Sequence, residues 1–414
     1  MSMRLVGRWL VARRALMGGL FLGLIVASWV RCTPAAADEP VVRYSPEVEA
    51  HIQHIVAALI EPKLVAGKPA STVSLSDRMT QLHVPGVSIA FVHHGQIEWS
   101  RGFGAERVGG APVTPDTLFQ AGSISKPVTA MAVLSLAQSG RLDLDADVSR
   151  YLRSWKLPDS RYTETEKVTL RRLLTHTAGV TIHGFQGYAA GQSIPSLRQI
   201  LDGSPPANSP PVGIDTTPGA AWRYSGGGYV IIQQVLEDVS GEPFAKLMDE
   251  VVLGPLGMNQ STFDQPLPQG ELEKATTPYD DQGQPIKGGA HIYPEMAPAG
   301  LWTTPSDLAR YIIELQNALS GKSSAVLSRA TALKMVAPGG LGQWGLGFQL
   351  GGAPGSPAFG HEGGNAGFVS LFVAYEDGDA VVIMTNGSRG DALIQEVLRT
   401  IACEYRWPDF QPEP

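Results

Sequence analysis

Apolar residues gather in four short runs, two near each end of the chain, and these runs predict strands. Residues 87–92 and 97–102 flank the polar segment His93-His94-Gly95-Gln96, and residues 368–374 and 380–385 flank an acidic segment that contains a glycine. Runs rich in β-branched and aromatic residues, separated by polar turns of this kind, are typical of β-hairpins. The pattern therefore predicts one hairpin towards the N-terminus and another towards the C-terminus.

A different spacing, with apolar residues three or four positions apart, predicts helices at residues 46–63 and 391–405. The segment Thr304-Pro305-Ser306-Asp307 has the sequence of a helix start, with a capping threonine, a proline in the first turn and an acid three residues after the cap. The apolar positions of the two terminal helices are Val48, Ile52, Ile55, Val56 and Leu59 in the first, and Leu393, Ile394, Val397, Leu398 and Ile401 in the second.

Strands at both ends of the chain and mostly helices between them predict an α/β protein of the α+β type. In this fold class, the N- and C-terminal strands form one antiparallel sheet with flanking helices, and a mostly helical region is inserted between them. Hydrophobic residues make up 43% of the 414 residues and charged residues 17%, which is sufficient for a large core. Since no linker divides the chain after residue 37, we expect one domain over residues 38–414.

The first 37 residues have the pattern of a signal peptide. A basic segment is followed by an apolar run at residues 16–30 and by the small residues Ala35-Ala36-Ala37, a typical cleavage site. An uncleaved membrane anchor is the alternative, although the apolar run is short for a bilayer span. The pair Arg13-Arg14 also leaves export by the twin-arginine route open. We expect the mature protein to be exported to a bacterial periplasm or secreted, without stable membrane insertion.

Charge and cysteine content narrow the possible functions further. Removal of residues 1–37 takes away five arginines and no acids, so that the formal net charge falls from −7 to −12. Nucleic-acid binding relies on a basic surface, and we therefore expect no nucleic-acid partner. Cys403 is the single cysteine after residue 37, which excludes an intrachain disulfide in the mature chain.

The segment Ser123-Ile124-Ser125-Lys126 is the strongest candidate for chemistry. Residues three apart share a helix face, so the Ser123 hydroxyl and the Lys126 amine can touch. A buried lysine that loses its charge can remove the proton from a serine, which makes the hydroxyl a nucleophile. A serine at a helix N-terminus also lies near free backbone N–H groups that can stabilise an oxyanion. This spacing alone is common, and its interpretation depends on other motifs.

Further segments strengthen the interpretation. Trp222-Arg223-Tyr224-Ser225-Gly226 and Gly360-His361-Glu362-Gly363-Gly364 follow the Ser-x-x-Lys motif in order, and residues 173–180 and 299–308 form two additional blocks. Together these five blocks resemble the serine beta-lactamase and penicillin-recognising superfamily, especially its class C-like and esterase-like branch. The resemblance covers about residues 45 to 403. It implies the same sheet-and-helix fold, with an active site in the cleft between the two parts.

The resemblance also implies roles for individual residues. Ser123 would be acylated, and Lys126 would take its proton or stabilise the phenolate of Tyr224. Tyr224 would relay the proton to the leaving group and later activate the deacylating water, with a neighbouring lysine charge bringing its pKa towards neutrality. Whether lysine or tyrosine is the base stays open. Outside this context, a buried core tyrosine is the simpler interpretation of Tyr224.

The motif on the C-terminal strand supplies the remaining candidates for the site. His361 occupies the family's lysine or histidine position, near a substrate carboxylate or the tyrosine, unless it is a strand-end histidine without a role. Gly363 would let the substrate approach the strand closely. The N–H of Gly364 would complete the oxyanion hole with that of Ser123.

The sequence departs from the family pattern at Gly226, where the family has an asparagine that holds the amide oxygen of a penicillin or peptide side chain. This departure favours an exported serine hydrolase that cleaves an ester or a small amide. The alternatives are a penicillin-binding D-alanyl carboxypeptidase or D-aminopeptidase, a class C-like beta-lactamase, and an inactive binding module. Substrates would be small esters, amides or D-amino-acid peptides.

The other histidines do not predict a metal site. His176, between two threonines at a helix end, is expected to form hydrogen bonds rather than react. His51 and His54 are three residues apart but no third ligand is evident, and His93 and His94 lie in a predicted turn. We predict neither a metal nor a cofactor.

Overall fold

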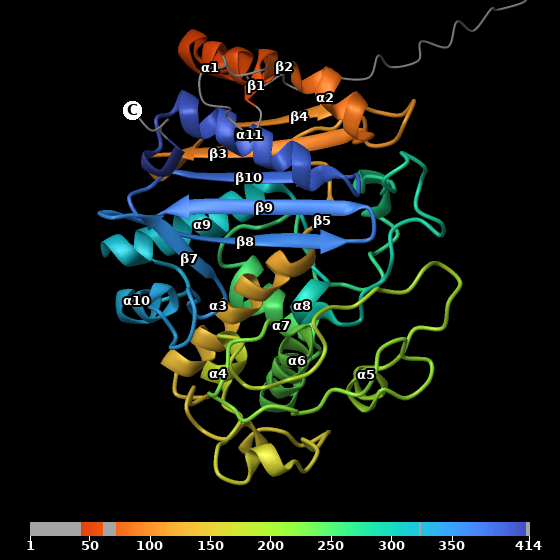
Figure 1. Ribbon diagram of the computed structural model, residues 1–414, viewed down its shortest axis with the longest axis vertical. Helices are drawn as coiled ribbons and strands as arrows, with labels where there is room; N and C mark the ends of the chain where they lie inside the picture. The colour runs from red at the N-terminus through yellow and green to blue at the C-terminus, as the bar shows by residue number, and fades with distance from the viewer. Residues whose placement is uncertain (1–42, 61–71, 323, 411–414) are drawn as a thin grey trace, which may run out of the picture. The chain divides into compact units, whose positions relative to one another are not determined.

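A six-stranded antiparallel sheet forms the centre of the protein, with the strand order β4-β3-β10-β9-β8-β7 (Figure 1). The computed structural model describes residues 43–60, 72–322 and 324–410, and the expected signal peptide lies outside this part. Strand β3 pairs with β10, with Val92 opposite Ala380, so that the two ends of the chain meet in one sheet as predicted. The strands are β3 (Gly86–His93), β4 (Gln96–Gly104), β7 (Gln349–Ala353), β8 (Ser356–Asn365), β9 (Phe368–Tyr375) and β10 (Ala380–Thr385).

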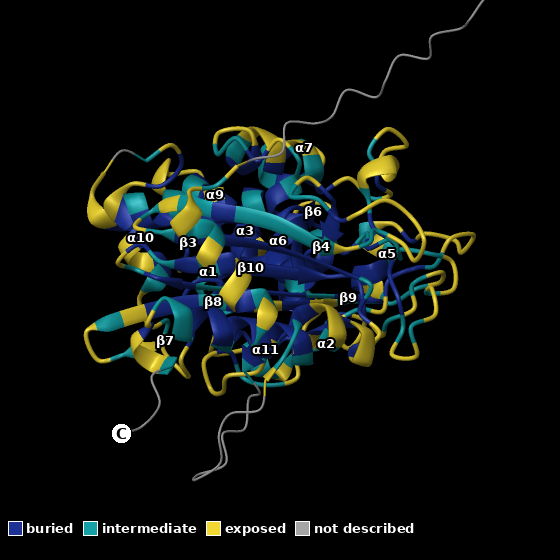
Figure 2. Cartoon of the chain, turned by 90° about the horizontal axis from the view of Figure 1, so that it is seen from above, coloured by how far each residue is buried: buried dark blue, intermediate teal, exposed yellow. Residues whose placement is uncertain are grey.

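Alternate residues of these strands face two separate hydrophobic cores, because successive side chains of a strand point to opposite faces. Val87, Ile89 and Phe91 pack in one core, and Ala90 and Val92 in the other. The sheet is therefore buried between two layers of helices (Figure 2). The first core includes α1 (Pro46–Ala57), α2 (Leu75–Leu82) and α11 (Gly390–Glu404), and the second includes α3 (Ser125–Gln138), α6 (Gly226–Ser240) and α9 (Pro305–Ser320).

Helices are the main regular elements of the region between β4 and β7, as the sequence predicted. In Figure 1, α3 and α6 lie beyond β8, whereas α9 packs against β3 and β10. None of the described helices combines the length and the hydropathy that a membrane span requires. Further helices are α4 (Leu170–Leu174), α5 (Leu197–Asp202), α7 (Phe244–Met248), α8 (Met296–Ala299) and α10 (Arg329–Val336), and short helical turns include the 3₁₀ turn η1 (Gly122–Ile124). Two small sheets pair β1 (Leu59–Ile60) with β2 (Thr72–Val73) and β5 (Phe119–Gln120) with β6 (Trp302–Thr303).

One local prediction is wrong and another is confirmed. The first helix ends at Ala57 rather than continuing through Leu59, because Leu59 leaves the helix to pair with Val73 in the small sheet of β1 and β2. The helix start at Thr304 is confirmed, since its hydroxyl accepts a hydrogen bond from the Asp307 N–H at 3.2 Å. The Thr304 cap could thus be predicted from four adjacent residues, whereas the end of the first helix depends on the pairing of Leu59 with Val73.

Candidate active site

Ser123 and Lys126 lie together at the junction of η1 and α3. Ser123 is in the 3₁₀ turn and Lys126 is the second residue of the helix, so three positions carry the chain through about one turn. The Lys126 Nζ donates a hydrogen bond to Ser123 Oγ at 2.9 Å and another to the Pro298 carbonyl at 3.0 Å. The contact predicted from the Ser-x-x-Lys spacing is present.

A buried serine holds this junction in place. The Ser125 hydroxyl donates to the Gly122 carbonyl at 2.6 Å and accepts from the Leu301 N–H at 3.0 Å. Since Gly122 precedes Ser123, these bonds tie the turn that carries the hydroxyl to the segment after α8. The backbone turn that carries Ser123 is therefore anchored to this segment.

The environment of Lys126 favours its neutral form. The side chain is buried, and the loss of hydration lowers its pKa to about 7. Its Nζ lies 4.8 Å from the ring centroid of Tyr224 and 5.7 Å from that of Tyr229. These rings enclose the amine, and near pH 7 a substantial fraction of Lys126 can accept a proton.

Tyr224 lies directly before α6, next to the helix cap Ser225. Burial raises the pKa of Tyr224 well above its ordinary value, the charge of Glu362 raises it further, and a hydrogen bond with Ser123 lowers it in part. The expectation that a lysine charge brings this pKa towards neutrality is therefore not met. The physical reason is that a buried phenolate is costly and that Lys126, whose own pKa is lowered to about 7, is only partly charged near neutral pH.

An aromatic wall supports Tyr224. The His176 ring lies 4.3 Å from the Tyr224 ring and 5.1 Å from the Trp344 ring, measured between centroids. His176 Nδ1 accepts a hydrogen bond from the Ser225 N–H at 3.1 Å, and burial lowers the pKa of His176. His176 thus holds the Tyr224 segment as a neutral acceptor, which agrees with its expected hydrogen-bonding role. Trp344 was not predicted, although a tryptophan in a glycine-rich segment was a visible signal.

His361 is buried on β8 and lines the cavity that also contains Ser123 and Tyr224. Its Nδ1 is 2.5 Å from the Glu362 carbonyl, an acceptor, so Nδ1 carries the proton and Nε2 has a free lone pair. Burial, followed by the charge of Lys126, lowers the pKa of His361 to about 3. His361 is therefore neutral at physiological pH and brings no positive charge to a substrate carboxylate, one of the two neighbours that the sequence suggested.

Two glycines are tied to the close packing of β8 on the turn that carries Ser123. A Cβ at Gly363 would lie 2.0 Å from the Ala121 carbonyl oxygen and 2.3 Å from Ser370 Oγ, so Gly363 makes room for this turn, and it also lines the cavity. A Cβ at Gly122, which has a φ of +53°, would lie 2.6 Å from the Gly364 nitrogen. These close approaches bring the backbone of Gly364 to the start of the turn that carries Ser123.

Gly226 is covered by a neighbouring loop. Its N–H donates to the His183 carbonyl at 2.9 Å, and a Cβ there would lie 3.0 Å from that oxygen and 3.1 Å from the Phe185 ring. The space of the family's asparagine is therefore partly filled by residues 183–185, which line the cavity.

These groups surround one cavity of about 650 Å³ between the β8 edge and the helical region. Its walls include Ser123, Lys126, His183, Phe185, Trp222, Tyr224, Trp344, His361, Glu362, Gly364, Asn365, Val369, Leu371, Asp391, Ile394 and Gln395.

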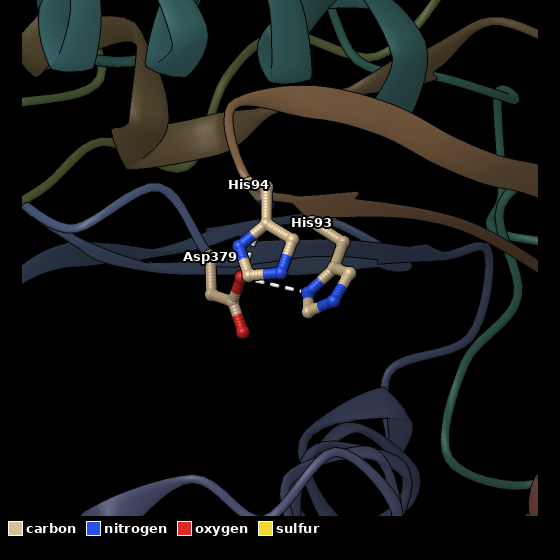
Figure 3. A group of neighbouring side chains, drawn as sticks. All are labelled: His93, His94 and Asp379. Atoms are coloured by element: carbon tan, nitrogen blue, oxygen red, sulfur yellow. Dashed lines mark hydrogen bonds and ion pairs between the residues drawn. The ribbon is translucent and has the colours of Figure 1, made fainter.

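The histidines outside the cavity have structural contacts. His93 Nδ1 lies 2.9 Å from Asp379 Oδ1, which also accepts from the His94 N–H at 3.2 Å, as Figure 3 illustrates for the three side chains. The other Asp379 oxygen accepts from Trp407 Nε1 at 3.1 Å. The possible ligand atoms of His93, His94 and Asp379 are close enough to hold a metal ion. However, the hydrogen bonds account for this grouping, because they connect the turn between β3 and β4 to the turn between β9 and β10. His51 lies 2.6 Å from Glu404 on α11.

Comparison with known families identifies the class of this site. The beta-lactamase family model matches residues 71–403, which include Ser123, Lys126, Tyr224 and His361. The chain belongs to the beta-lactamase family. It is a serine hydrolase of the beta-lactamase-related type.

Two relatives of this beta-lactamase family member differ in their described activities. Penicillin-binding protein 4 of Amycolatopsis lactamdurans is 27% identical over 360 residues, which cover 81% of this chain and 90% of the relative. Esterase EstB of Burkholderia gladioli is 31% identical over 252 residues, which cover 56% of this chain and 60% of the esterase.

A solved structure shows the same fold. D-amino acid amidase from Ochrobactrum anthropi SV3, in complex with L-phenylalanine amide, superposes with a TM-score of 0.65 at 21% identity, covering 87% of this chain and 99% of the amidase. The predicted fold of the family is confirmed by this similarity.

Proposed function

We propose that this protein is an exported serine hydrolase that cleaves esters or small amides through an acyl-enzyme on Ser123. The observation that carries the proposal is the 2.9 Å contact between Lys126 Nζ and Ser123 Oγ at a lysine whose pKa is lowered to about 7. A neutral amine at this distance can accept the hydroxyl proton when the oxygen attacks a carbonyl carbon.

In the acylation step, Ser123 Oγ forms a bond to the substrate carbonyl carbon while its proton moves to Lys126 Nζ. The developing oxyanion is stabilised by the N–H groups of Ser123 and Gly364. Tyr224 holds its proton because its pKa is raised, and it hydrogen-bonds with Ser123. It can therefore donate this proton to the leaving alcohol or amine as the carbonyl–leaving-group bond breaks, and be reprotonated from Lys126.

In the deacylation step, a water molecule attacks the acyl carbon and loses a proton to Lys126. The ester bond to Ser123 breaks, and the serine oxygen recovers a proton, which regenerates the resting enzyme. His361, neutral with a free Nε2 lone pair, is a hydrogen-bond acceptor at the wall of the cavity. It can orient a donor of the substrate or the attacking water.

The preference for esters or small amides is supported by the surroundings of Gly226. This position lacks the family's asparagine amide, and residues 183–185 cover it. The esterase relative is consistent with this preference. A D-alanyl carboxypeptidase, D-aminopeptidase or beta-lactamase activity is the second candidate, favoured by the longer match to a penicillin-binding protein. An inactive module is disfavoured because serine, lysine and tyrosine are all present and in contact.

Export is supported by the sequence of residues 1–37, which we propose are removed to leave one domain at 38–414. The mature N-terminus is then expected close to Asp38.

A substrate panel with an active-site label tests the proposal. Purified protein is assayed with p-nitrophenyl acetate and butyrate, nitrocefin and D-alanyl dipeptides, and is treated separately with a fluorophosphonate. We expect fast ester hydrolysis and one label on Ser123, and loss of both in Ser123→Ala. Turnover of nitrocefin or the dipeptides above that of the esters would support the second candidate instead. Labelling that persists in Ser123→Ala would contradict the assignment.

A further inference from the structure

The cavity extends to α11, where Asp391 and Ile394 line it, and this part of the cavity is called the α11-side lobe. Successive residues of β8 alternate between two faces: Gly363 faces the turn that carries Ser123, whereas Glu362 and Gly364 face α11. Their partners across the strand pair are Leu371 and Val369, which also line the cavity. Apart from its chain neighbours, no described residue lies within 4 Å of a Cβ built at Gly364, so the space on this side of the strand is open.

The lobe combines an apolar floor with two carboxylates at its rim. Val369, Leu371 and Ile394 provide the floor, and Glu362 and Asp391 provide the carboxylates. Both acids are exposed, and neither carboxylate has a hydrogen bond or an ion pair within the described part of the chain. Glu362 lies between His361 and Gly363 on β8, which line the same cavity as Ser123.

Positive charge is scarce in the same cavity. Among the described residues that line it, Lys126 is the sole lysine or arginine, and it is engaged with Ser123 and the Pro298 carbonyl. His361 is neutral because burial lowers its pKa to about 3. A substrate carboxylate would therefore meet two acids and no free cation, whereas a cationic group would meet complementary charge.

We propose that the α11-side lobe, formed by Glu362, Gly364, Val369, Leu371, Asp391 and Ile394, binds a positively charged group of the substrate. The favoured substrate is then an ester or small amide that carries an alkylammonium or quaternary ammonium group. This inference rests on the proposed hydrolase function and specifies its substrate class.

Two matched series of esters test the charge preference on either side of the scissile bond. The first consists of p-nitrophenyl esters whose acyl chains end in trimethylammonium, tert-butyl or sulfonate, which are similar in size and differ in charge. The second compares acetylcholine with the acetate of its uncharged tert-butyl analogue. In at least one series we expect kcat/KM for the cation to exceed that of the neutral ester by about fivefold or more, as for one or two exposed ion pairs. The sulfonate should be the poorest substrate.

Variants locate the preference within the lobe. The double variant Glu362→Gln with Asp391→Asn removes both charges with little change in shape, and the ratio of cationic to neutral kcat/KM should fall to near one. Glu164→Gln is the matched control, because Glu164 is exposed and does not line the cavity. Glu164→Gln also removes a negative charge from the protein, but outside the cavity. It should therefore leave the ratio of cationic to neutral kcat/KM unchanged.

The outcomes separate this inference from the function beneath it. Turnover of the neutral esters without a cationic preference in either series would overturn the inference and leave the hydrolase intact. A preference that survives the double variant, or that falls equally in Glu164→Gln, would also overturn it. Absence of turnover with every ester would instead contradict the proposed function.

Discussion

Lys126 Nζ donates a hydrogen bond to Ser123 Oγ across 2.9 Å, and the same amine is buried against the Tyr224 ring at 4.8 Å from its centroid. One amine thus contacts the Ser123 hydroxyl and lies against the ring of Tyr224. Burial lowers the pKa of Lys126, so the position of this side chain in the core is the reason why its amine can be neutral near pH 7.

The first prediction concerns pH. Since Lys126 acts as a base only when neutral, kcat/KM should rise with pH through about 7 and then level off. The raised pKa of Tyr224 predicts no fall of the rate below pH 10. Lys126→Arg, which stays charged, should lose nearly all activity at every pH. Steady-state rates with p-nitrophenyl butyrate between pH 5 and 9 measure this profile, because the range extends about two pH units to either side of the Lys126 pKa. A flat profile over this range would exclude Lys126 as the base.

The second prediction concerns stability. Lys126 has a lower pKa in the folded state, about 7, than in the unfolded chain, where it is about 10.4, so between these values the unfolded state binds more protons and stability rises with pH. Lys126→Met removes this dependence while retaining an unbranched side chain. At pH 6, Lys126→Met should be more stable than wild type by about 2–3 kcal/mol, and this advantage should shrink as the pH rises to about 9.

Urea unfolding of both proteins at several pH values measures this difference. The loss of the hydrogen bonds to Ser123 and Pro298 opposes the gain and is the same at each pH. The pH dependence of the difference is therefore the decisive quantity, and a constant difference would contradict a lowered pKa for Lys126.

The third prediction concerns Tyr224. If its phenol donates a proton to the leaving group, Tyr224→Phe should reduce hydrolysis of alkyl esters and amides by about 100-fold or more. p-Nitrophenyl esters should lose less, because their leaving group departs without a proton. A rate ratio between ethyl and p-nitrophenyl butyrate in both proteins tests this, and equal losses would indicate a purely structural role for Tyr224.

The fourth prediction concerns Gly226. An asparagine here would have to displace the His183 carbonyl and the Phe185 ring, which would lie at 3.0 and 3.1 Å from its Cβ. Gly226→Asn should therefore lower the melting temperature and fail to increase the rate with nitrocefin relative to p-nitrophenyl butyrate. Gly226→Ala controls for the added carbon. An increase in the nitrocefin ratio for the asparagine variant alone would show that the loop yields to the side chain.

Local sequence patterns predicted the parts of the site that local geometry determines. Three positions between Ser123 and Lys126 bring the two side chains together in either a 3₁₀ or an α-helical turn. Tyr224 and His361 needed the ordered family motifs, because their approach to Ser123 depends on distant segments of the chain.

The parts that could not be predicted depend on tertiary packing. The space beside Gly363 is taken by Ala121 and Ser370. Ala121 is distant from Gly363 in the sequence, and Ser370 reaches it because the two residues are opposite each other in the pair of β8 and β9. Residues 183–185 cover Gly226 only in the folded chain, and the pKa of Tyr224 is raised because folding buries its ring. No spacing rule contains this information.

The central claim is tested most directly by trapping the acyl-enzyme. The wild-type protein is mixed with p-nitrophenyl butyrate, quenched with acid during turnover and digested for mass spectrometry, with Ser123→Ala treated in parallel. The account predicts one butyryl group on the peptide that contains Ser123, at the oxygen of that residue, and none in Ser123→Ala. Butyryl transfer to another residue during turnover, or hydrolysis of the ester at an undiminished rate by Ser123→Ala, would contradict it.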